Sequence, residues 1–68
     1  MFELDAKKIG KKLQELRGDR PRTVVAQAVG VSTSALAMYE QGERIPRDTI
    51  KIKIATYYNR SIEEIFFI

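Results

Sequence analysis

The sequence predicts an all-α protein, with five short helices in a single domain over residues 1–68. Glycine, proline and asparagine residues divide the chain into five segments of helical length. Within those segments, apolar residues recur at the three- and four-residue spacing of one helix face. Residues that cap helices precede several of the segments, and a chain of 68 residues leaves no room for a second domain.

The first helix is expected to follow Asp5, which can act as its N-cap, and to end before Gly18. Ile9, Leu13 and Leu16 recur at i, i+4 and i+7, and lysines occupy the positions between them. This pattern is typical of an amphipathic helix with one buried face.

The second and third helices are separated by a glycine. The second is expected over Arg22–Val29, with Pro21 at its start and Gly30 as the stop. Ser32 can cap the third helix. Its inward residues are Ala35, Leu36 and Tyr39.

The fourth segment fits two interpretations on periodicity alone. Ile50, Ile52 and Ile54 alternate with charged residues, as they would in a β-strand. We assign a helix because Ile50 and Ile54 also share a helical face with Tyr57 and Tyr58. A single strand would, in addition, have no strand to pair with.

Capping residues predict the last helix. Asn59 tolerates the left-handed conformation that ends a helix, and Ser61 and Glu64 have the spacing of a capping box. The helix is therefore expected to continue through Ile65 and Phe66.

The composition excludes several classes of function. The chain has no Cys and no His, so disulfides, thiolate metal sites and histidine-based catalysis are absent. We expect no enzymatic activity, no metal and no cofactor. The acidic start of the chain differs from a secretory leader, and the uncharged run Thr23–Tyr39 is too polar to span a membrane. These features predict a cytoplasmic protein.

The charges are unevenly placed along the chain, although the net charge is only +3. The uncharged run has arginines on both sides, a distribution that favours binding to a polyanion, with a hydrated surface as the alternative. These arginines are Arg17, Arg20 and Arg22 before the run, and Arg44 and Arg47 after it.

The spacing of small and apolar residues indicates a helix-turn-helix over about residues 22–41. Ala26 allows the two helices to cross closely, and Gly30 permits the tight turn between them. Val31 and Leu36 are placed to seal the corner. The wider pattern continues in Ser34, Tyr39-Glu40-Gln41-Gly42-Glu43-Arg44-Ile45-Pro46, Ile54-Ala55, Tyr58-Asn59 and Ser61-Ile62-Glu63-Glu64-Ile65-Phe66.

With these residues the chain resembles the xenobiotic-response-element (XRE) family, the helix-turn-helix proteins that include phage repressors and Cro. The resemblance implies a compact five-helix bundle of the phage-repressor type, with the third helix in the major groove of DNA. It implies a structural ion pair between Arg17 and Glu40. It assigns base reading to Thr33, Ser34, Ala37 and Met38, and contacts to the DNA backbone to Arg22, Gln41, Arg44 and Arg47.

The expected function is a sequence-selective regulator of transcription, acting as a repressor at the nucleoid. We expect it to bind double-stranded DNA as a homodimer, because one helix reads too few base pairs to select a site. The candidate dimer contacts are Phe66, Phe67 and Ile68. The base-reading positions include no Arg, Lys, Asn or Gln, so the strongest readers of guanine and adenine are missing. An antitoxin that also binds a protein, or a helical adaptor that binds protein alone, remain alternatives.

Overall fold

The structure is a computed structural model, and it describes residues 5–68, which form five helices and contain no strand. The all-α prediction is confirmed, and the ambiguous fourth segment is a helix. Residues 1–4, on which the expected absence of a secretory leader partly depends, lie outside the described residues. The helices are α1 (Ala6–Arg17), α2 (Arg22–Val29), α3 (Thr33–Glu40), α4 (Asp48–Tyr58) and α5 (Ile62–Phe66).

Side-chain caps fix where three of the helices begin. The Asp5 carboxylate accepts hydrogen bonds from two first-turn amides of α1, at 3.1 Å each. The Ser32 hydroxyl accepts an amide of α3 at 3.0 Å. At α5, Ser61 and Glu64 form a complete capping box. Each bond satisfies an amide that has no partner inside its own helix.

Residues in the left-handed conformation end two of the helices as predicted. Gly30 ends α2 at φ 78°, and Asn59 ends α4 at φ 56°. Both lie in the left-handed region, which glycine and asparagine adopt at lower cost than other residues. The turn at Gly30 sends the chain directly into α3, so the helix-turn-helix geometry depends on this residue.

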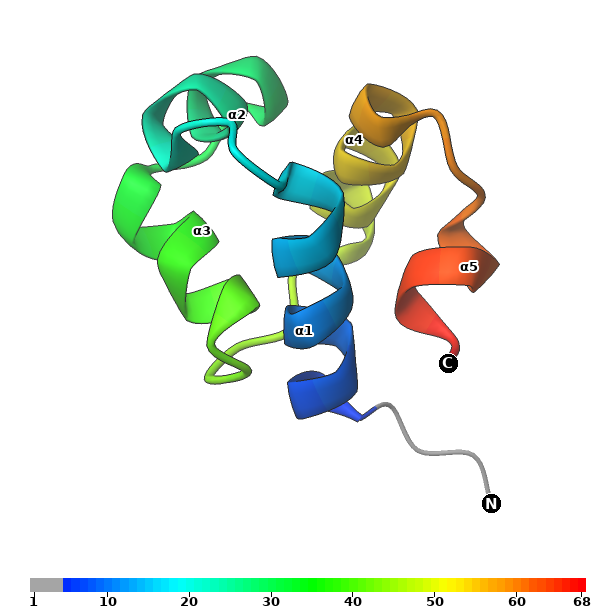
Figure 1. The fold of residues 1–68 in the computed structure, drawn as a ribbon. Helices are drawn as coiled ribbons and strands as arrows, with labels where there is room; N and C mark the ends of the chain where they lie inside the picture. The colour runs from blue at the N-terminus through cyan, green and yellow to red at the C-terminus, as the bar shows by residue number, and fades with distance from the viewer. Residues whose placement is uncertain (1–4) are drawn as a thin grey trace.

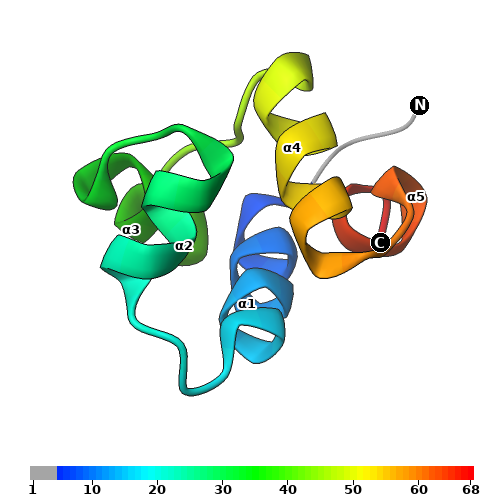
Figure 2. The same cartoon turned by 90° about the horizontal axis from the view of Figure 1, so that it is seen from above.

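The helices enclose one hydrophobic core. In both views α1 lies between α3 on one side and α5 on the other, while α2 packs against α3 and α4 (Figure 1, Figure 2). No helix in the described part of the chain is both long and apolar enough to cross a membrane. The buried core residues are Ile9, Leu13, Val25, Ala26, Val29, Leu36, Tyr39, Ile54, Ala55, Ile65 and Phe66.

The C-terminal end of α3 lies directly against α1. A Cβ atom on Gly10 would come within 2.8 Å of the Tyr39 carbonyl oxygen, so only glycine permits this approach. Two side chains of α1 bond the carbonyl groups at the end of α3. Gln14 donates to the Glu40 carbonyl at 2.7 Å, and Lys7 donates to the Gln41 carbonyl at 3.1 Å. Helix α1 therefore fixes the position of α3.

Candidate nucleic-acid interface

Helix α3 buries one face and leaves the predicted reading face accessible. Leu36 is buried in the core. On the other side, Thr33 and Ser34 are exposed, and Ala37 and Met38 are half-buried. The four side chains assigned to base reading are therefore those that remain accessible along α3 after its core contacts are made.

Exposed arginines lie beside the start of α3. A groove of about 400 Å³ runs between the N-terminal ends of α3 and α4, and its lining includes Ser32, Arg44, Arg47 and Thr49. Arg44 and Arg47 are both exposed. The structure thus brings the two arginines from the α3–α4 segment next to the cap of α3, where positive charge attracts an anion.

Glu40, the last residue of α3, is a buried carboxylate that binds two arginines. Arg17 donates from Nε to Oε2 at 2.8 Å and from Nη2 to Oε1 at 3.1 Å. Arg22 donates from Nε to Oε1 at 2.9 Å. The hydrogen bond to Glu40 is the main reason that the pKa of Arg17 is raised. One carboxylate therefore joins α1, α2 and α3.

The contact between Arg22 and Glu40 was not foreseen from the sequence, which assigned Arg22 to the DNA backbone alone. The side chain of Arg22 is 35% exposed, whereas that of Glu40 is fully buried. No local pattern indicates this pair, because it depends on how α2 crosses α3. Gln41, the other predicted backbone contact at this end of α3, is exposed.

Arg20 is also exposed, but it contacts aromatic rings and does not line the groove with Arg44 and Arg47. Its guanidinium lies 5.7 Å from the ring centre of Tyr57 and 5.6 Å from that of Tyr58. Nη1 also donates to the Leu16 carbonyl at 3.2 Å. Cation–π contacts of this kind link the turn after α1 to the end of α4. Arg20 thus has a structural role that its charge alone did not reveal.

The C-terminal residues require one correction. Phe66 is 0% exposed and belongs to the core, so it is not available as a dimer contact. Phe67 and Ile68 are 46% and 45% exposed. Ile62, Ile65 and Phe66 have the i, i+3, i+4 spacing of a buried face, a signal that places Phe66 inside and Phe67 outside.

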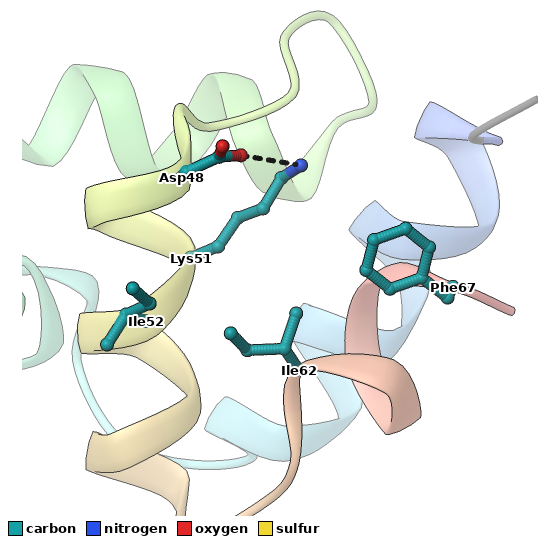
Figure 3. Close-up of a pocket in the computed structure, with 5 residues that line it drawn as sticks. All are labelled: Asp48, Lys51, Ile52, Ile62 and Phe67. Atoms are coloured by element: carbon teal, nitrogen blue, oxygen red, sulfur yellow. Dashed lines mark ion pairs between the residues drawn. The ribbon is translucent and has the colours of Figure 1, made fainter.

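An apolar pocket that the sequence did not predict includes Phe67, one of these C-terminal residues. A pocket of about 330 Å³ lies between α4 and α5 and is lined by Asp48, Lys51, Ile52, Ile62 and Phe67 (Figure 3). Ile52 is 52% exposed. Lys51 lies mostly buried at this pocket, with Nζ 3.6 Å from the Asp48 carboxylate and 5.8 Å from the centre of the Phe67 ring.

Comparisons with known proteins agree with the resemblance seen in the sequence. The family described as Helix-turn-helix matches residues 13–65. The crystal structure of the restriction-modification controller protein C.AhdI from Aeromonas hydrophila is similar, with 28% sequence identity and a TM-score of 0.82. The match covers 91% of this chain and 97% of C.AhdI. No curated protein matched the sequence.

Proposed function

This chain belongs to the helix-turn-helix family of DNA-binding transcriptional regulators, and we propose that it is a sequence-selective repressor that places α3 in the major groove. The observation that carries the proposal is the face of α3. Thr33, Ser34, Ala37 and Met38 remain accessible along α3. The exposed Arg44 and Arg47 line a groove with Ser32, the N-cap of the same helix. Such an arrangement combines a surface for base edges with charge for the phosphate backbone. The protein would act in the cytoplasm, at the nucleoid.

Base reading by this helix would depend on methyl groups more than on paired hydrogen bonds. Thr33 and Ser34 offer single hydroxyls, which bond to several bases equally well. Ala37 and Met38 offer apolar contacts, for which the thymine methyl is the complementary feature in the major groove. We therefore expect thymines opposite α3, with part of the selectivity coming from DNA shape.

A substitution on α3 tests the placement of this helix. Ala37→Glu puts a negative charge on the reading face, so it should abolish binding to duplexes that the wild-type protein selects from a random pool. Ala28→Glu is the matched control, because Ala28 is exposed on α2 and lines a groove towards α4. The control should still bind. Equal binding by both variants would place α3 outside the groove and favour a protein-binding adaptor.

We further propose that two copies pair through the surface that Ile52, Ile62 and Phe67 form between α4 and α5, together with Ile68, which lines the adjoining groove along α1. Three of these four side chains are about half exposed, and Ile52, Ile62 and Phe67 line one pocket. Asp48 and Lys51 place opposite charges beside the apolar centre. A two-fold interface joins identical surfaces, so a face that carries both signs of charge can complement itself.

The dimer is tested by charging its proposed centre. Ile52→Lys should shift the protein from dimer to monomer in sedimentation equilibrium, because it would bury a lysine opposite an apolar surface. Val24→Lys is the control, since Val24 lies on α2 and is also 52% exposed. The control should leave the molar mass unchanged. A dimer that survives Ile52→Lys but not Val24→Lys would move the interface to α2.

A further inference from the structure

Two arginines donate hydrogen bonds to the Glu40 carboxylate, but they differ in which guanidinium nitrogens remain unbonded. Arg17 uses all three side-chain nitrogens. In addition to its two bonds to Glu40, its Nη1 donates to the Arg20 carbonyl at 2.8 Å. Arg22 bonds to Glu40 only through Nε, and within residues 5–68 neither of its Nη atoms has an acceptor. Each side-chain nitrogen of Arg17 thus makes a hydrogen bond, whereas the Nη groups of Arg22 make none within the described residues.

Burial shows which end is fixed and which is accessible. The Glu40 side chain is 0% exposed, that of Arg17 is 19% exposed, and that of Arg22 is 35% exposed. Arg22 is the first residue of α2. Its Nε thus donates to a buried carboxylate, while its two Nη atoms, which are unbonded in the described part of the chain, are not buried.

We propose that Glu40 is a positioning residue for DNA binding, which holds Arg22 by Nε so that its two Nη groups form a fork for one backbone phosphate. The inference rests on the proposed function and adds a role for a residue that does not itself touch DNA. An arginine suits both contacts because its planar group has donors on two sides. A lysine has one ammonium group and could not make both contacts in this way.

Two consequences follow from this arrangement. A side chain that is already fixed loses less conformational entropy when it binds, so the phosphate contact forms at lower cost. The cluster of two arginines and one glutamate also keeps a net positive charge. Glu40 therefore orders Arg22 without cancelling its attraction to DNA.

The first test compares the two arginines. Arg22→Gln and Arg17→Gln remove the same charge from the same carboxylate, and each variant is titrated with a mixed-sequence DNA duplex over about 50 to 200 mM salt. Arg22→Gln should make the negative slope of log K against log salt shallower by about 0.9 for each bound chain, the amount expected for one lost phosphate contact. Arg17→Gln should leave the slope unchanged. Equal slopes for the two variants would overturn the proposal.

The second test isolates the role of Glu40. Glu40→Gln removes a negative charge, which should by itself raise the affinity for DNA. That gain does not depend on Arg22. Loss of positioning does depend on Arg22, so the proposal predicts non-additivity in a double-mutant cycle. Glu40→Gln should reduce affinity about 2- to 10-fold more when Arg22 is present than when it is replaced by glutamine. The same change in both backgrounds would show that Glu40 does not act through Arg22.

A measurement on the wild-type protein keeps the proposal testable if the Glu40 variant does not fold. The NMR signal of the Arg22 Nε–H should exchange with water much more slowly than that of the exposed Arg44. On adding the duplex, the Arg22 Nη signals should shift while the Nε–H stays protected. Rapid Nε–H exchange, or Nη signals that do not respond to bound DNA, would overturn the positioning role. Failure of the wild-type protein to bind any duplex would instead reject the proposed function itself.

Discussion

Gly10 of α1 lies against the main-chain carbonyl of Glu40, at the point where α3 ends. A Cβ atom at this position would also come within 2.8 Å of the Tyr39 carbonyl, closer than real Cβ contacts allow. Both contacts are with main-chain carbonyl groups, which cannot move aside as the flexible end of a side chain can. The two helices must therefore separate if residue 10 gains a side chain, and α3 must then move relative to the rest of the domain.

Gly10→Ala should lower the free energy of unfolding by about 1 to 3 kcal/mol, as expected for overpacking. In an open helix the same change would stabilise the protein by about 0.5 to 1 kcal/mol, so the sign of the effect decides whether the contact exists. Urea denaturation measures this, with the exposed neighbour Lys11→Ala as the control. A variant more stable than wild type would contradict the close approach of α1 and α3.

Glu40→Ala should destabilise the domain by about 3 to 5 kcal/mol, because it leaves two partly buried arginines without their carboxylate. The control is Glu43→Ala, since Glu43 is exposed in the segment after α3. That surface change should fall within about 0.5 kcal/mol of wild type. Thermal unfolding distinguishes them, and an unchanged midpoint for Glu40→Ala would show that the ion pairs contribute nothing to stability.

Tyr58→Phe should not destabilise the protein at neutral pH. In the described part of the chain, the buried Tyr58 hydroxyl has no hydrogen-bond partner, so its removal relieves an unsatisfied polar group. Removing this group should leave stability unchanged or raise it by about 1 kcal/mol. Urea denaturation at neutral pH measures the difference. A clear loss of stability would mean that the hydroxyl has a partner.

The same residue predicts a dependence on pH. Burial, followed by the nearby Glu40 charge, raises the pKa of Tyr58 from 10.0 to about 12. A group whose pKa is raised on folding contributes stability that is complete below its unfolded pKa and is lost as the pH rises. The free energy of unfolding should therefore decline between pH 10 and about 12, because the unfolded chain releases this proton at lower pH than the folded protein does. Tyrosinate absorbance should show a late titration step that Tyr58→Phe abolishes.

Thymine methyl groups should carry part of the DNA affinity. Replacing thymine by uracil removes only the methyl group, so binding should weaken by roughly 1 kcal/mol at each position that Ala37 or Met38 contacts. Scanning a selected operator one thymine at a time measures this. Arg44→Ala, by contrast, should weaken binding to all duplexes alike. An operator that tolerates uracil everywhere would rule out apolar readout by α3.

The sequence predicted the elements of this fold because their signals are local. Asp5, Ser32 and the Ser61–Glu64 box mark helix starts, and Gly30 and Asn59 mark helix ends. Each signal depends on bonds within a few residues of itself. The periodicity of α4 was ambiguous because Ile50, Ile52 and Ile54 alternate with charged residues. On the helix, Ile52 is the one of these three that is exposed.

Contacts between helices have no local signal of this kind, and the one that was expected, between Arg17 and Glu40, came from the family resemblance alone. The bond from Arg22 to Glu40 depends on how α2 crosses α3. Ala26 and Gly30 indicate that the two helices cross, but they do not indicate that these two side chains meet.

The burial of Lys51 was not predicted, because a charged residue is expected to face solvent. Lys51 nevertheless lies three residues before the buried Ile54, on the same helix face. Its long aliphatic chain and the aromatic rings near its ammonium explain how it is accommodated.

The attachment of α3 through its buried face and its C-terminal end has a consequence for protein engineering. Its anchors are Leu36 and Tyr39 in the core, and Glu40 against α1 and α2. None of these is a proposed reading residue. The side chains of the reading face could therefore be replaced as a set by those of another regulator, and the domain would serve as an interchangeable scaffold whose operator changes while its stability is retained.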